Sequence, residues 1–167
     1  MLKPLRQAIE DGDTISAVIK GTAVNHGGQA TSLTAPNPDA QSQLITKALE
    51  DANVPASSIG YIEAHGTGTA LGDPIEVSGL KQTFEGSVAS QGSAPFCGLG
   101  TIKSNIGHLE GAAGVAGIMK VLLCLDKKQL PATLHYKQLN PEIDLLGSPF
   151  YVVDSLRPWA SLNNGVR

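Results

Sequence analysis

Two glycine-rich segments, each carrying a histidine, limit what this chain can fold into. The first reads HGTGTALGDPIE over residues 65–76, and the second reads KSNIGH over residues 103–108. Each follows a short run of apolar and β-branched residues, so each segment begins where a β-strand is expected to end. Most of the 19 glycines lie in or near these two regions. Because glycine in a folded segment costs conformational entropy, this clustering indicates positive φ angles or close backbone approach.

Strands and helices are predicted to alternate along the chain. Strands are expected at 15–21, 59–64, 96–101 and 150–153, helices at 38–52, 73–84 and 111–128, and polar loops at 25–37 and 87–94. Asn37 is a suitable N-cap before Pro38. Asp73-Pro74-Ile75-Glu76 has the pattern of a capping box, which explains Glu76 as a cap without a catalytic role.

This alternation predicts an α/β fold with parallel strands joined by helical crossovers. Ligands of open α/β sheets bind beyond the carboxyl ends of the strands. His65 follows the second expected strand, and Lys103 and His108 follow the third. The topology therefore predicts that these three side chains share one crevice.

The helix expected at 111–128 has no charged residue between Gly111 and Met119. Its first half is almost entirely glycine and alanine, which favours a buried central helix packed closely on its neighbours. Lys120, Lys127 and Lys128 are expected near water. Cys97, within a strand, and Cys124, on this helix, are interpreted as buried structural cysteines.

Composition narrows the class of protein. At 167 residues and a net charge of −3, with scattered basic residues, the chain is expected to be one globular domain that does not bind nucleic acid. We find no signal peptide and no apolar run of membrane-spanning length, so no membrane association is expected. Two cysteines suit a reducing compartment, which predicts a cytoplasmic location.

The two segments carry residues suited to acyl chemistry. Two imidazoles that converge on one carbonyl can stabilise an enolate, and Lys103 would add positive potential. Thr67 and Thr69 offer hydroxyls at the mouth of the crevice. Taken singly, His65 and His108 could instead be loop residues that cap or form turns. His26 and His135 lack such motifs and are interpreted as surface or structural residues. A zinc site is not expected, and neither loop has a phosphate- or dinucleotide-binding pattern, so no bound cofactor is expected.

Several long motifs, in order, resemble the C-terminal half of a β-ketoacyl synthase (ketosynthase) domain of modular polyketide synthases. They are HGTGT with GDP-x-E behind it, KSNIGH-LEGAAG-x-AG, the segment at 2–28 and NPEIDLLGSPFYV at 140–152. The similarity covers essentially the whole chain. The NHGG loop and the start of the helix at PNPDAQ are most similar to synthases whose acyltransferase acts in trans.

The resemblance implies a thiolase-like fold of two similar α/β halves, with a cysteine from the first half and two histidines from the second. His65 and His108 match those histidines, and Lys103 matches the lysine that supports them. Thr67 and Thr69 match threonines that contact the phosphopantetheine arm of an acyl carrier protein. The implied reaction is decarboxylative Claisen condensation between an acyl-enzyme and malonyl-carrier protein, in a domain that is homodimeric when complete.

Residues 1–167 lack the half that bears the nucleophilic cysteine and the closing GFGG strands of the family. The isolated chain is therefore expected to be inactive, and the apolar face of its longest helix is expected to be exposed. Two alternatives stay open. One is a split or remnant half that acts as a docking module for a partner half or an acyl carrier protein. The other is a relative within the thiolase superfamily that uses another acyl acceptor, and the intact HGTGT and NIGH pair argues against it.

Overall fold

The computed structural model of the chain describes residues 1–28, 36–87 and 94–160. Within these ranges the α-helices are α1 (Leu5–Glu10), α2 (Pro38–Ala52), α3 (Gly72–Thr83), α5 (Lys103–Ile106) and α6 (Ala113–Lys127), with 3-10 turns η1 (Ala56–Ser58) and η2 (Glu110–Ala112). The strands are β1 (Tyr61–Glu63), β2 (Cys97–Gly100), β3 (Gln129–Leu130), β4 (Phe150–Val152) and β5 (Arg157–Pro158). The loops predicted at 25–37 and 87–94 lie partly outside the described residues.

Three parallel strands form the sheet that positions the candidate site. Its order is β1-β2-β4, with Glu63 opposite Gly100 and Leu99 opposite both Ile62 and Val152. A separate antiparallel pair joins β3 to β5. The predicted parallel strands with helical crossovers are confirmed.

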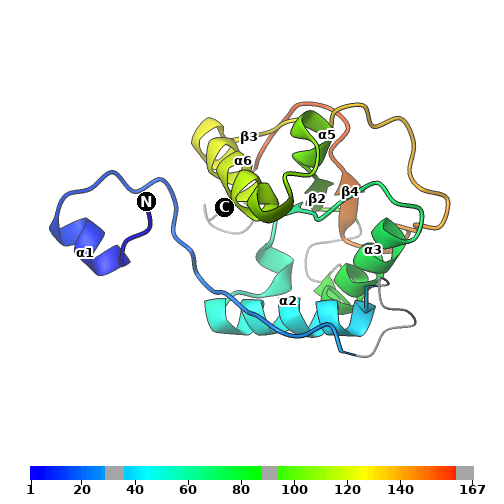
Figure 1. Cartoon of the computed structure of the whole chain (residues 1–167), viewed down its shortest axis with the longest axis horizontal. Coiled ribbons are helices and arrows are strands. Elements are labelled where there is room, and N and C mark those ends of the chain that lie inside the picture. Colours follow the sequence, from blue (N-terminus) through cyan, green and yellow to red (C-terminus); the bar gives the residue numbers. More distant parts are fainter. Residues whose placement is uncertain (29–35, 88–93, 161–167) are drawn as a thin grey trace.

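Helices cover both faces of this sheet, because successive side chains of a strand point to opposite faces. On one face, Cys97 and Leu99 of β2 pack with α3, and the Phe84 and Phe150 rings meet edge to face with their centroids 5.0 Å apart. On the other face, Tyr61 of β1 packs with α6 residues and with Trp159. Figure 1 shows α2 and α3 below the strands and α6 above them.

The start of α2 confirms the predicted cap. The Asn37 side chain accepts hydrogen bonds from the amides of Asp39 and Ala40, and Pro38 occupies the first helical position. The helix ends at Asn53 in the left-handed conformation. α2 packs against α3 so closely that a Cβ at Gly79 would lie 2.9 Å from the Pro38 carbonyl oxygen. Glycine at this position therefore lets the two helix backbones approach.

Two local predictions are wrong. Residues 15–21 do not form a strand, because no described strand lies beside them to complete a hydrogen-bond ladder. They belong to an extended arm that carries α1 away from the body of the molecule (Figure 1). The capping box is also absent: α3 begins at Gly72, whose amide donates to the Thr69 hydroxyl, and the carboxylates of Asp73 and Glu76 are used elsewhere.

The helix predicted at 111–128 forms as α6, but it is not buried within this chain. Its buried residues are Gly117, Lys120 and Cys124. Four of its large apolar side chains are more than half exposed, with exposed fractions of 63% for Val115, 54% for Ile118, 55% for Met119 and 60% for Leu123. An open groove of about 1320 Å³ runs between this helix and the N-terminal arm. The expected exposed apolar face is therefore confirmed.

A second prediction about this helix, the exposure of Lys120 to water, is wrong. The lysine was expected near water, yet its side chain is only 7% exposed, and its ammonium lies 2.8 Å from a carboxylate oxygen of Glu63. A buried ammonium persists only with such a partner.

Of the helices in the described ranges, none is long and apolar enough to cross a membrane.

Dye binding tests the exposed face of α6. Because Ile118 and Met119 are more than half exposed, their double replacement by glutamine should weaken binding of a hydrophobic dye and change the unfolding free energy by less than about 0.5 kcal/mol. Fluorescence titration and urea denaturation measure both quantities. The matched change Leu130→Ala, at a residue 1% exposed, should cost about 2–5 kcal/mol. Undiminished dye binding in the double variant would show that the dye binds an apolar surface other than the face of α6.

Candidate active site

His65 lies directly beyond the carboxyl end of β1. The strand leaves the sheet at Ala64, whose amide donates to the Gly100 carbonyl at 2.8 Å. The next two amides, of His65 and Gly66, donate to the two carboxylate oxygens of Glu76 at 2.7 and 2.9 Å. The carboxylate of Glu76 therefore holds the backbone that carries His65.

Glycine is required at position 66. Its φ is +46°, in the left-handed region, and a Cβ there would lie 3.0 Å from the Cβ of Thr101. A larger residue would strain the backbone and push the loop after β1 away from the loop after β2. The glycine thus keeps the two histidine-bearing loops close together.

Lys103 and His108 follow the neighbouring strand. β2 leads into the single-turn helix α5, which begins at Lys103 and ends at Gly107 with a φ of +73°. The Nδ1 atom of His108 accepts a hydrogen bond from the Glu110 amide at 2.9 Å. A neutral imidazole that accepts at Nδ1 carries its proton on Nε2. His108 therefore forms a local turn through Nδ1 and carries its donor on Nε2.

The structure brings the two histidines together as predicted. Their ring centroids lie 5.4 Å apart, with the ring planes at 84° to each other, and both residues are exposed. His65 and Lys103 line the open groove beside α6, whereas His108 is not among the lining residues of this groove, so the predicted sharing of one crevice holds for two of the three side chains. Parallel pairing of β1 with β2 produces this arrangement, because the carboxyl ends of adjacent parallel strands meet at one edge of the sheet.

The two threonines differ in their surroundings. Thr67 and Lys103 line a second groove, of about 610 Å³, whose lining also includes most of the residues between Thr133 and Leu145. The Thr69 hydroxyl instead accepts from the Gly72 amide at 3.0 Å and lies 3.5 Å from the Thr67 hydroxyl. Thr67 is thus placed to meet a ligand in this groove, and Thr69 shapes the turn that leads into α3.

The other two histidines, His26 and His135, lie outside the pair formed by His65 and His108. His26 accepts from the Gly28 amide through Nδ1, at 3.0 Å, and so forms a turn. His135 lines the second groove, and this location was not predicted from the sequence. Within the described ranges, no group of three His, Cys, Asp or Glu side chains is arranged to hold a metal ion.

Three carboxylates that bind the backbone of the site were not predicted from the sequence. Glu76 was assigned to a capping box, whereas it accepts from the loop of His65, and Asp73 accepts from the Gly68 amide at 3.1 Å. Glu63, at the end of β1, accepts from the Ile102 amide at the start of α5. Acidic residues close to glycine-rich turns were the available signal, since the exposed amides of such turns need acceptors.

Neither cysteine is placed as a nucleophile. Cys97 is fully buried, and its burial raises the pKa of the thiol to about 12. Burial also raises the pKa of Cys124 above its ordinary value. A thiol attacks as the thiolate, so these two groups are inert at neutral pH while the chain is folded. The predicted structural role of both is confirmed.

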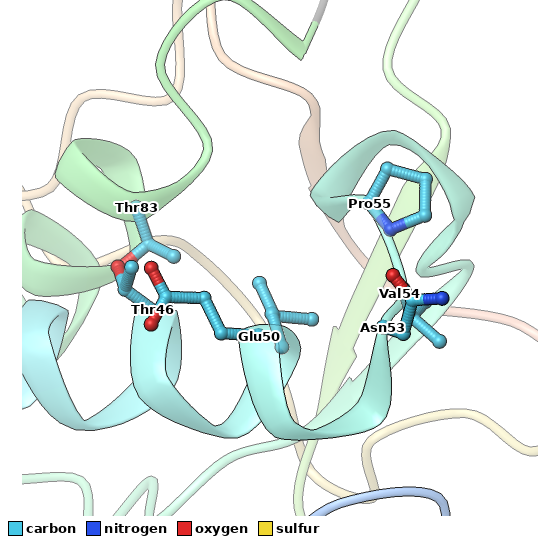
Figure 2. Close-up of a pocket in the computed structure, with 7 residues that line it drawn as sticks. Thr46, Glu50, Asn53, Val54, Pro55 and Thr83 are labelled. Atoms are coloured by element: carbon cyan, nitrogen blue, oxygen red, sulfur yellow. The ribbon is translucent and has the colours of Figure 1, made fainter.

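A further hollow lies on another part of the molecule. It has a volume of about 480 Å³ and is formed by the last turns of α2 with Thr83 of α3. Figure 2 shows Glu50 beside Thr46 and Thr83 on one side and Asn53 to Pro55 on the other. This hollow shares no lining residue with either groove described above, and Glu50 is its one ionisable residue.

Comparison with known proteins identifies relatives. Residues 16–137 match the family described as "Beta-ketoacyl synthase, C-terminal domain". The chain is 51% identical over 166 residues to polyketide synthase PksN of Bacillus subtilis, covering 98% of this chain and 3% of the relative. It is 48% identical over 167 residues to polyketide synthase ThaG of Burkholderia thailandensis, covering 100% of this chain and 3% of the relative.

Two solved structures extend the comparison. The oxazolomycin ketosynthase domain OzmH KS7 of Streptomyces albus superposes with a TM-score of 0.90 at 44% identity, covering 97% of this chain. The module 6 ketosynthase of the bacillaene synthase from Bacillus subtilis superposes with a TM-score of 0.88 at 40% identity, covering 96% of this chain. The chain spans 28% of each of these two solved chains.

Replacing Glu76 tests its role in holding the loop. Glu76→Ala removes the acceptor of the His65 and Gly66 amides, so both amides should exchange with solvent at least about tenfold faster. The cost in stability should be about 1 kcal/mol, because water can solvate the exposed loop. Amide exchange followed by NMR measures the effect. Glu85→Gln, at an exposed carboxylate just after α3, is the control; equal exchange in both variants would contradict the role.

Alkaline denaturation tests the buried thiol. The pKa of Cys97 is raised from 9.0 to about 12 in the fold, so its stabilising contribution is complete below about pH 9 and is lost as pH rises toward 12. Between these limits the parent chain should lose up to about 1.4 kcal/mol per pH unit more than Cys97→Ala. Urea denaturation at a series of pH values measures both slopes. Parallel slopes would show that Cys97 ionises normally.

Proposed function

The chain belongs to the β-ketoacyl synthase family, of the polyketide synthase type with a thiolase-like fold, and we propose that it supplies the histidine half of a polyketide ketosynthase active site. The reaction proposed for the complete domain is decarboxylative Claisen condensation between an acyl-enzyme and malonyl-carrier protein. The observation that carries this proposal is the convergence of His65 and His108, whose ring centroids are 5.4 Å apart.

The histidine pair suits the decarboxylation step. When malonyl thioester loses CO2, the electron pair of the broken bond moves toward the thioester and negative charge develops on its carbonyl oxygen. Donors on His65 and His108 aimed at that oxygen would stabilise the enolate. The enolate carbon then attacks the acyl thioester, forming a carbon–carbon bond and breaking the bond to the nucleophilic sulfur. The sulfur leaves as a thiolate.

Lys103 and the threonines have supporting roles in this proposal. Lys103 lines both grooves, so its positive charge can favour anionic states at the point where the grooves meet. Thr67 lines the second groove, where its hydroxyl can bind the phosphopantetheine arm of an acyl carrier protein. Thr69 would act mainly through the turn that it stabilises. No cofactor is proposed to bind this chain directly.

The nucleophilic cysteine is proposed to come from outside this chain, because Cys97 and Cys124 are both buried thiols with raised pKa values. The groove beside α6 is where the cysteine-bearing half would pack. It is lined by His65 and Lys103 together with exposed apolar residues of α6, so a partner there would cover the helix and complete the site. Alone, the chain is proposed to be inactive.

One alternative function is favoured by a specific observation. The exposed apolar face of α6 would also suit a docking module that binds a partner half or an acyl carrier protein without catalysis. Both histidines are present and lie close together, which favours the catalytic assignment over this alternative. A homodimeric complete domain, a trans-acting acyltransferase and a cytoplasmic location stay predictions of the sequence.

Intact mass spectrometry tests the proposal. A reactive acyl-pantetheine thioester should leave the isolated chain unmodified, while a complex with a cysteine-bearing first half should become acylated and then condense with malonyl-carrier protein. His65→Ala and His108→Ala should each lower condensation about 10²–10⁴-fold while acylation persists. His26→Ala is the matched control. An adduct on Cys97 or Cys124 of the isolated chain would overturn the proposal, and binding without condensation would favour the docking module.

A further inference from the structure

A buried ion pair lies directly behind the histidines. Glu63 ends β1, two residues before His65, and its side chain is 12% exposed. Its Oε2 atom lies 2.8 Å from the ammonium of Lys120 on α6, which is 7% exposed. The Tyr61 hydroxyl donates to the same oxygen at 2.7 Å and accepts from Lys120 at 2.7 Å. The three side chains therefore form a closed triangle between the sheet and α6.

The triangle is electrostatically coupled. Burial, followed by the negative charge of Glu63, raises the pKa of Tyr61 far above its ordinary value. The phenol therefore stays protonated and keeps its donor for the carboxylate. Two charges withdrawn from water persist only while they compensate each other, so removal of either partner leaves an unpaired buried charge.

The second carboxylate oxygen of Glu63 links this triangle to the other histidine loop. It accepts from the Ile102 amide, the backbone group immediately before Lys103 and the start of the segment that ends at His108. On the side of α6, a Cβ at Gly117 would lie only 3.1 Å from the Cγ of Glu63. A single carboxylate thus touches both strand ends and the helix behind them.

We propose that Glu63 and Lys120 are positioning residues that set the spacing between His65 and the Lys103–His108 segment. Glu63 belongs to the strand that carries His65 and binds the backbone that leads to His108. Lys120 compensates the charge of Glu63 and ties it to α6. Enolate stabilisation needs both imidazoles at one oxygen, and misplacement of catalytic groups by about 1 Å can cost about 100-fold in rate.

The structural part of this inference is tested on the chain itself. In Glu63→Gln an acceptor oxygen remains, but Lys120 loses its counter-charge; in Lys120→Met the charge of Glu63 is unpaired. In both variants we expect the Ile102 and Lys103 amides to exchange at least about tenfold faster and the ring signals of His65 and His108 to shift. Glu50→Gln, which removes an exposed carboxylate in the hollow of Figure 2, should leave all these signals unchanged.

The double variant Glu63→Gln/Lys120→Met separates positioning from folding. It removes both charges together, so it should recover stability and part of the Ile102 protection relative to either single variant. Exchange within twofold of the parent chain in both single variants would overturn the proposal. If either single variant does not fold, the double variant serves as the test. Ile102 exchange and histidine ring signals in the double variant that match those of the parent chain would then also overturn the proposal.

The kinetic part rests on the proposed function and uses the complete ketosynthase domain that contains this segment. Both single variants should lower decarboxylation of malonyl-carrier protein at least about tenfold and leave acylation of the nucleophile within twofold. Equal losses in both steps, or no loss in either, would contradict positioning. If the parent domain itself does not condense, the proposed function fails, while amide exchange in the chain still decides the role of Glu63 and Lys120.

Discussion

Where β1 and β2 leave the sheet, their backbone amides lose the acceptors that neighbouring strands supply, and carboxylates replace those acceptors. Glu76 accepts from the two amides after β1, and Glu63 accepts from the amide that begins α5. Backbone donors left unpaired in a half-buried loop would favour collapse of the loop onto other acceptors. The geometry of the two histidines depends on this replacement, because His65 and Lys103 directly adjoin the anchored amides.

The two carboxylates act from different depths. Glu76 belongs to α3 and reaches the loop of His65 from a half-buried position. Glu63 lies beneath the site, where its charge must be matched by Lys120. A buried ion pair contributes little net stability because desolvation offsets its attraction. The role proposed for this pair is to position the two histidine-bearing loops.

Packing decides which side of α6 carries the buried Lys120 and which side carries exposed apolar residues. Periodicity correctly predicted the helix, whereas the burial predicted from the absence of charge before Met119 is not found in this chain, where Ile118 and Met119 are exposed. Helical spacing could not show that Lys120 lies on the side facing Glu63, because a lysine at the edge of an apolar helix usually reaches water. Likewise, residues 15–21 have the composition of a strand but no described neighbour to pair with.

The sequence by itself determined the three parallel strands β1, β2 and β4, the helices α2, α3 and α6, the cap of α2 and the placement of His65, Lys103 and His108 after successive strands. These features depend on local propensity and on the rule that parallel strands end at one edge. Only the tertiary structure decided which acidic residues hold the loops, that Lys120 is buried, and that Thr67 lines a groove while Thr69 forms a turn. The burial of Lys120 depends on its contact with Glu63, which is distant in sequence and leaves no local pattern. The contacts of Glu76 and Thr69 with the loops are closer in sequence, but they depend on the folded path of the backbone.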